Sequence, residues 1–156
     1  MSKSLARVRA ALELSGASFD LREMPVETRT AQQAAEAAGC VPDQIVKSLV
    51  FRGTDSGQIK LFLTAGSSRV DPAKAAALAG EPLAPADAAL VRAVTGFAIG
   101  GVAPLGHLTP CAQWMDPRLM DFAVVWAAAG TPRHVFAIAP GDLYRITGAT
   151  LAGFTA

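Results

Sequence analysis

The sequence feature that most restricts the fold is a pair of apolar segments, residues 46–52 and 59–65, joined by Gly53-Thr54-Asp55-Ser56-Gly57. In a strand, successive side chains point to opposite faces, and both faces of the first segment are mostly apolar. Such a strand is covered on both sides and lies centrally in its sheet. A glycine-containing turn of this length commonly joins antiparallel strands. The pair therefore predicts a hairpin at the centre of a sheet.

Helices and further strands alternate along the rest of the chain. Capping and periodicity signals predict helices between Ser4 and Gly16, Thr30 and Gly39, and Asp71 and Gly80, and over residues 86–94 and 141–147. Strands are expected over residues 19–22, 112–115, 122–128 and 134–138, with a short one near the C-terminus. Several strands are joined by tight turns, which favours a mixed or mainly antiparallel sheet over a doubly wound parallel one. With no internal repeat or linker, residues 1–156 are expected to form a single α/β domain.

Composition limits the possible partners. The net charge is +1, and the basic residues are scattered along the chain. Proteins that bind long nucleic acids usually present a concentrated basic face. DNA is therefore not an expected partner, and any contact with a nucleic acid would involve a short end of that molecule or need a helper protein. The N-terminus lacks a signal-peptide core, and no stretch approaches the roughly 20 apolar residues of a membrane span. We expect a cytoplasmic protein without membrane contact.

Lys47 is the most informative candidate for a functional residue. It lies inside the apolar strand, where a lysine is costly unless its ammonium group finds a partner or reaches a cleft. A structural alternative is a lysine whose ammonium extends to solvent from the end of the strand. In a cleft, the compact charge and three donors of a lysine suit a phosphate or a carbonyl oxygen.

A second candidate is the apolar, glycine-rich stretch over residues 96–106. A solvated loop is normally polar, so this loop is expected to lie against a core or a pocket wall. Glycines such as Gly100 and Gly101 let main-chain amides approach a ligand closely, and such amides can hold an oxyanion or a phosphate. The structural alternative is a tight turn. The stretch matches neither the phosphate loop nor the dinucleotide-binding fingerprint.

Other combinations of reactive residues are weaker. Cys40, His107, Cys111 and His134 lack the spacing of a zinc site, so no metal and no other cofactor is expected. The two cysteines are expected to be free thiols. A small-molecule hydrolase that uses His107 or His134 remains an alternative without a supporting motif.

Several segments together resemble the YbaK/prolyl-tRNA-synthetase-associated editing domain family in order and spacing. They are Val46-Lys47-Ser48-Leu49-Val50-Phe51, Gly66-Ser67-Ser68-Arg69-Val70-Asp71, Thr95-Gly96-Phe97 with residues 100–106, Ala128-Ala129-Gly130, and residues 142–149. The resemblance implies an α/β domain with a mixed, strongly curved β-sheet surrounded by helices. It also implies that the protein is a freestanding, trans-editing deacylase that hydrolyses the ester of a mischarged tRNA.

The resemblance also implies roles for particular residues. The family's lysine falls on Lys47 and its close-approach glycine on Gly101, which we interpret as catalytic. Substrate-binding positions fall on Ser48, Gly100, Val102, Ala103, Pro104 and Ala128. The expected substrate is the acceptor end of a tRNA, tRNA(Pro) in particular, that carries a small non-cognate amino acid, with prolyl-tRNA synthetase as a possible partner.

This sequence departs from the Cys-tRNA(Pro)-cleaving branch of that family. Members of that branch have tyrosine where this chain has Phe97, and serine where it has Ala103 and Ala128. The resemblance therefore implies that this chain lacks hydroxyl groups in or near the pocket, which bears on the amino acid that it removes.

The alternative function is a non-catalytic module that binds a tRNA end or a synthetase.

Overall fold

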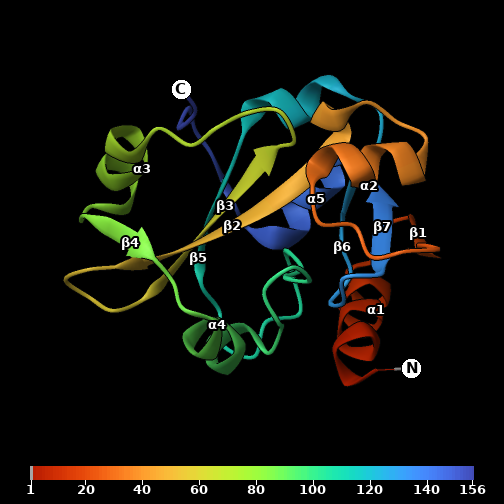
Figure 1. Ribbon diagram of the computed structural model, residues 1–156, viewed down its shortest axis with the longest axis horizontal. Helices are drawn as coiled ribbons and strands as arrows, with labels where there is room; N and C mark the ends of the chain where they lie inside the picture. Colours follow the sequence, from red (N-terminus) through yellow and green to blue (C-terminus); the bar gives the residue numbers. More distant parts are fainter. Residues whose placement is uncertain (1) are drawn as a thin grey trace.

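The computed structural model describes residues 2–156, and within them the chain forms five α-helices, two 3₁₀-helices and one eight-stranded sheet (Figure 1). The helices are α1 (Lys3–Ser15), α2 (Ala31–Ala38), α3 (Pro72–Ala79), α4 (Ala88–Thr95) and α5 (Pro140–Thr147), with 3₁₀-helices η1 (Pro42–Gln44) and η2 (Pro117–Asp121). The strands are β1 (Phe19–Glu23), β2 (Ile45–Gly53), β3 (Ile59–Ala65), β4 (Leu83–Pro85), β5 (Ala112–Met115), β6 (Val125–Ala128), β7 (His134–Ile138) and β8 (Thr150–Leu151).

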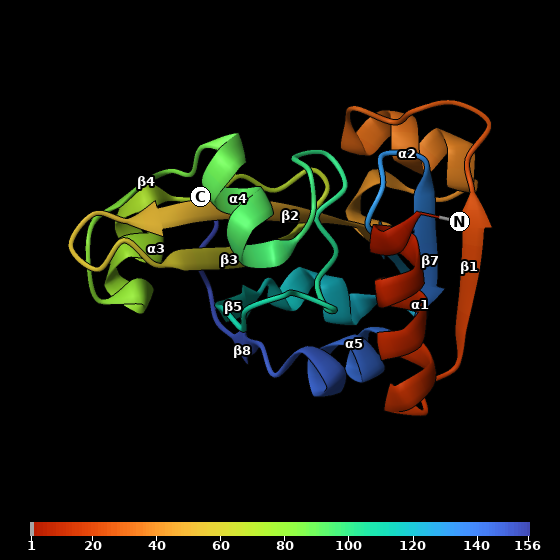
Figure 2. The same ribbon diagram turned by 90° about the horizontal axis from the view of Figure 1, so that it is seen from below.

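The sheet is mixed, as the tight turns predict. Its strand order is β1-β7-β6-β2-β3-β5-β8, and β4 pairs with β2 outside this path. Four pairings are antiparallel (β1 with β7, β6 with β7, and β2 with both β3 and β4), whereas β2–β6, β3–β5 and β5–β8 are parallel. The sheet curls so strongly that the β1–β7 part stands at a steep angle to the β2–β3 part (Figure 2). This confirms the predicted single α/β domain with a curved sheet and surrounding helices.

The central hairpin is confirmed as β2 and β3. The two strands pair antiparallel from Val46↔Ala65 to Arg52↔Ile59, and Gly57 closes the turn with a positive φ of 74°. Every residue of β3 is buried. The hairpin is therefore the centre of the sheet, where β4 and β6 pair with β2 and β5 pairs with β3.

One edge of β2 is only partly paired. Strand β6 pairs with it at Ile45 and Val46, and β4 pairs with it from Phe51 to Gly53. Between these partners, residues 47–50 have a sheet neighbour on the β3 side only. This break in the sheet positions the pocket described below.

The main core lies between α1, the hairpin and the loop that follows α4. Leu5, Val8 and Leu12 form the buried face of α1, as the spacing of its apolar residues predicts. Phe97 and Val102 from the loop join the same core cluster. The loop between α4 and β5 crosses the molecule in front of β2 (Figure 2), so its apolar composition reflects contact with the core.

Two local predictions need correction, and one strand was not predicted. Ser2, not Ser4, caps α1, because the Ser2 hydroxyl accepts a hydrogen bond from the Leu5 amide at 3.1 Å. The strand expected over residues 122–128 begins only at Val125, since η2 and a bend occupy the preceding residues. Strand β4 carries no alternating pattern of its own and forms where its backbone pairs with β2.

No helix among residues 2–156 is long and apolar enough to cross a membrane.

Candidate functional site

A pocket of about 510 Å³ opens at the break in the sheet. Its walls come from five parts of the chain that lie apart in sequence. They are residues 28–34 before and within α2, residues 45–49 of β2, Gly100 and Val102 from the loop, and residues 126–135 of β6, β7 and their connection, with Gly66 completing the wall. The volume is in the range of small-molecule sites.

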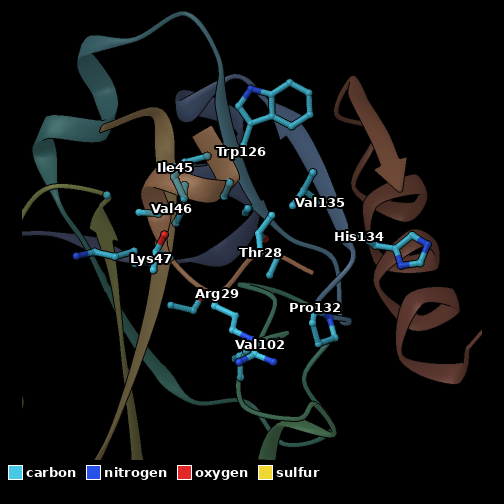
Figure 3. A pocket seen from close by; sticks show the side chains of 18 of the residues that line it. Thr28, Arg29, Ile45, Val46, Lys47, Val102, Trp126, Pro132, His134 and Val135 are labelled. Atoms are coloured by element: carbon cyan, nitrogen blue, oxygen red, sulfur yellow. The ribbon is translucent and has the colours of Figure 1, made fainter. Parts of the chain in front are cut away.

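The lining of this pocket is cationic and apolar. Arg29 and Lys47 supply positive charge, and no carboxylate lines the pocket in the described part of the chain. Figure 3 shows Trp126 and Val135 toward the opposite end of the pocket from Arg29 and Val102. A pocket with this distribution suits a ligand that has an anionic part and a compact apolar part.

Lys47 lies on β2 directly after the last residue that pairs with β6. Its Nζ donates a hydrogen bond to the Ser68 carbonyl oxygen at 2.7 Å, which leaves two further N–H donors. Burial lowers the pKa of Lys47 below its ordinary value, and the Arg69 guanidinium lowers it further, whereas Asp116 and Asp43 oppose the shift. The lysine is therefore held by a loop of its own chain at the pocket wall.

Asp43 fixes the loop that holds Lys47. Its carboxylate accepts hydrogen bonds from the Ser67 amide, at 3.0 Å, and from the Ser67 hydroxyl. It also accepts one from the Arg118 Nε at 3.1 Å. The Ser67 hydroxyl is the main cause that holds the pKa of Asp43 below its usual range. Asp43 thus connects Arg118 to the loop whose Ser68 carbonyl binds Lys47.

We expect Asp43→Asn to reduce kcat/KM by roughly fivefold, as for the loss of about 1 kcal/mol from a partly exposed charged hydrogen bond. Removing a nearby negative charge disfavours the ammonium form, so the pKa of Lys47 should fall. If the reaction needs the ammonium, the alkaline limb of the rate–pH profile then moves to lower pH.

The matched control for that variant is Asp121→Asn. Asp121 also pairs with Arg118, at 2.9 Å, but it has no hydrogen bond to Ser67. Its replacement should leave the alkaline limb where it is. Identical pH profiles for the two variants would contradict the positioning role of Asp43.

Ser48, the neighbour of Lys47, also lines the pocket. Its Oγ is buried, and no residue of the described chain forms a hydrogen bond with it. A buried hydroxyl without a partner is uncommon in a folded protein. Its hydrogen-bonding capacity is therefore unused within the described chain.

The glycine-rich loop contributes two of its predicted residues to the pocket, Gly100 and Val102. Gly100 has a φ of 94°, which favours glycine. Gly101 is buried and faces the protein itself, because a Cβ there would lie 2.9 Å from main-chain atoms of Thr131. Its amide donates to the Ala98 carbonyl at 3.0 Å, so the predicted ligand contact of this amide would require that bond to open.

The remaining predicted residues divide between pocket and core. Ala128, the last residue of β6, lines the pocket. Ala103 and Pro104 lie outside the lining, and their carbonyl oxygens accept hydrogen bonds from His107 Nε2, at 2.7 Å, and from Gln113 Nε2, at 3.1 Å. These two residues shape the loop that presents Gly100 and Val102.

Both histidines have internal partners. Nδ1 of His107 lies 3.5 Å from Cys111 Sγ, and burial lowers the pKa of this imidazole while raising that of the thiol to about 11. His134 lines the pocket, but its Nδ1 lies 2.6 Å from Thr131 Oγ1, and its ring points away from Lys47 (Figure 3). No cluster of three metal-binding side chains occurs between residues 2 and 156.

Sequence reasoning missed much of the pocket wall. Thr28, Arg29 and Thr30 precede α2 and were interpreted only through the capping role of Thr30, which the structure confirms with a 3.1 Å bond from the Gln33 amide. Thr131 and Pro132 belong to a turn between strands. The one available signal was an arginine flanked by two threonines next to a helix start.

Comparison with known proteins agrees with this architecture. The model of the aminoacyl-tRNA editing domain family matches residues 26–146. A curated relative, the uncharacterized protein YwhH of Bacillus subtilis (strain 168), is 31% identical over 140 residues, which cover 90% of this chain and 88% of YwhH.

Two solved structures are similar over nearly the whole chain. One, described as a candidate trans-editing enzyme for prolyl tRNA synthetase, is 46% identical, with a TM-score of 0.92 and coverage of 100% of this chain and 99% of its own. The other, the hypothetical protein APE2540, is 27% identical, with a TM-score of 0.88 and coverage of 96% and 99%.

Proposed function

The chain belongs to the aminoacyl-tRNA editing domain family, and from this premise we propose that it is a trans-acting deacylase that hydrolyses the ester of a mischarged tRNA in the cytoplasm. The observation that carries the proposal is the pocket, where Lys47 and Arg29 lie beside an apolar wall and no carboxylate lines the described surface. The 3′ end of an aminoacyl-tRNA combines phosphates with a compact aminoacyl group, and this pocket is complementary to both.

The proposed reaction is attack of water on the ester carbonyl carbon. The bond to the ribose oxygen breaks, that oxygen gains a proton, and the products are the free amino acid and the tRNA. Lys47 has two N–H donors left for the terminal phosphate or the carbonyl oxygen. An aminoacyl ester is already activated, so positioning and electrostatic stabilisation supply the catalysis, and a group of the substrate transfers the proton.

We propose tRNA(Pro) as the carrier and a small amino acid (alanine, serine, cysteine or threonine) as the group removed. Ala31, Ala34, Ala127 and Ala128 line the pocket, and Trp126 limits its extent with a large rigid ring. Excluding a bulkier or more rigid side chain by steric clash discriminates strongly, whereas rejecting a smaller one yields only roughly 1–3 kcal/mol per methylene. Prolyl-tRNA synthetase is the proposed source of the mischarged product.

The test is hydrolysis across a panel of aminoacyl-tRNA(Pro) species and the corresponding acceptor-stem minihelices. We expect release of a small amino acid from both, and no release from Pro-tRNA(Pro). Rapid cleavage of Pro-tRNA(Pro), or activity confined to bulky aromatic esters, would overturn the substrate assignment.

The same assay separates the deacylase from a non-catalytic module that binds a tRNA end or a synthetase. A binding module would protect the ester, so the half-life of the aminoacyl-tRNA would lengthen in its presence. An enzyme at a catalytic concentration shortens that half-life with multiple turnovers.

A further inference from the structure

The main chain of Ser48 points toward the break in the sheet. In an antiparallel ladder, hydrogen-bonded pairs alternate with pairs whose N–H and C=O groups point outward. The Gly53 amide donates to the Gln58 carbonyl at 2.9 Å, so this pair is hydrogen-bonded. Counting back along the register in steps of two, the pair Lys47↔Thr64 is also hydrogen-bonded, and Ser48↔Leu63 is not.

The residue opposite Ser48 provides an independent check. The Leu63 carbonyl accepts a hydrogen bond from the Asp116 amide at 2.8 Å, on the side of β3 away from β2. Leu63 therefore faces outward from the hairpin, as its pairing class requires. By the same alternation, the N–H and C=O of Ser48 face the opposite edge, where β6 and β4 lie.

Neither neighbouring strand reaches Ser48. The parallel ladder with β6 ends at Val46↔Ala127, and the antiparallel ladder with β4 begins at Phe51↔Pro85. No loop of the described chain bonds to the Ser48 main chain either. Ser48 thus presents an unpaired amide, an unpaired carbonyl and a buried hydroxyl without a partner at the pocket wall.

We propose that the N–H and C=O of Ser48 bind the aminoacyl group of the substrate as if it were one residue of an added strand. In a hydrogen-bonded antiparallel pair, one residue offers its carbonyl to its partner's amino nitrogen and its amide to the same partner's carbonyl. An aminoacyl ester carries this combination, an α-ammonium donor and a carbonyl acceptor on one residue. Added strands bind open sheet edges elsewhere by the same two bonds.

This inference rests on the proposed function and assigns recognition to two different surfaces. The strand edge binds the α-amino and carbonyl groups, which all amino acids share. The alanine-lined wall then selects among side chains. Accordingly, an acyl group without the α-amino group should bind poorly even when it fits the wall.

The experiment uses non-hydrolysable analogues, in which 3′-amino-3′-deoxyadenosine carries an alanyl or a propionyl group in amide linkage. These two differ only in the α-amino group. At pH 7 we expect the alanyl compound to bind at least about tenfold more tightly, as for the loss of one hydrogen bond from a charged donor. Its binding should also shift the Ser48 amide resonance in ¹⁵N–¹H spectra. Equal affinities, or an unmoved Ser48 resonance, would overturn the proposal.

Two substitutions separate the main chain from the side chain. Ser48→Ala removes the hydroxyl and should still bind the alanyl compound more tightly than the propionyl compound. If that difference in affinity disappears, the α-amino group is recognised by Oγ and not by the main chain. Replacing Ser48 by its α-hydroxy acid removes the N–H and also makes the Lys47 carbonyl a weaker acceptor. It should weaken binding of both acylated compounds, because both present a carbonyl. That N–H takes no part in the β2–β3 ladder, and the weakened Lys47 carbonyl affects only the one pair with Thr64, so we expect the fold to be retained with a slightly lower Tm.

The matched control is the same main-chain replacement at Phe51, whose N–H faces Lys60 within the ladder. It should lower the Tm more than the change at Ser48 and leave affinity for both compounds intact. A comparable loss of affinity at Phe51 would overturn the proposal.

Failure of this inference and failure of the proposed function look different. If mischarged tRNA is hydrolysed but the two analogues bind equally, the deacylase stands and the strand-edge contact is wrong. If no aminoacyl-tRNA is hydrolysed while the alanyl compound still binds more tightly through Ser48, the contact stands and the deacylase is wrong.

Discussion

The variant Lys47→Ala should lose at least about a hundredfold in deacylation rate while remaining folded. Removing one preorganised charged contact from a transition state typically costs a few kcal/mol. Lys47 is half-buried at the pocket wall and makes a single hydrogen bond to its own chain, to the Ser68 carbonyl. Because burial and Arg69 already disfavour the ammonium group, its loss should not destabilise the protein greatly.

Single-turnover rates and thermal melting of the same preparation test this expectation. Lys74→Ala is the matched control, since Lys74 also donates to a main-chain carbonyl, that of Thr155 at 3.0 Å, but lies outside the pocket. It should deacylate at the wild-type rate. Near-wild-type turnover in folded Lys47→Ala would remove this lysine from the mechanism.

Gly101→Val is the second change with a large expected effect, and the structure changes its interpretation. The sequence alone suggests that a side chain there would block the ligand and spare stability. In the structure, a Cβ at Gly101 would lie 2.9 Å from main-chain atoms of Thr131. This overlap can be relieved only by a shift of the backbone at one of the two residues. Overpacking of this kind costs about 1–3 kcal/mol or more.

We therefore expect Gly101→Val to lower the Tm by at least several degrees and to lose activity together with stability. The shift should be graded, with Gly101→Ala intermediate. Gly141→Ala is the control, because a Cβ at Gly141 meets nothing within 4 Å and its φ is ordinary. A Gly101→Val protein that melts with the wild type and is inactive would restore the ligand-contact interpretation.

Local signals were sufficient for most of the elements. Apolar residues on both faces of β2, followed by a glycine turn, correctly predicted a central hairpin, because the side-chain period and the turn depend on neighbouring residues. The cap of α2 by Thr30 was predicted for the same reason. Strand β4 was not, because its three residues carry no alternating pattern and its pairing partner lies some thirty residues earlier in the chain.

For the site, the sequence by itself predicted a lysine in an apolar strand, with its ammonium group in a cleft or at the strand's end, and an apolar glycine loop against a core or a pocket wall. The structure places Lys47 at a pocket and the loop against the core. Only the tertiary structure decided how these parts meet. Strands β6 and β4 pair with different ends of β2, and the gap between them creates the pocket and exposes Ser48. The same folding turned Gly101 toward Thr131 and brought Arg29 to the pocket wall. These contacts join residues tens of positions apart, and local periodicity carries no information about which distant backbone will be the neighbour.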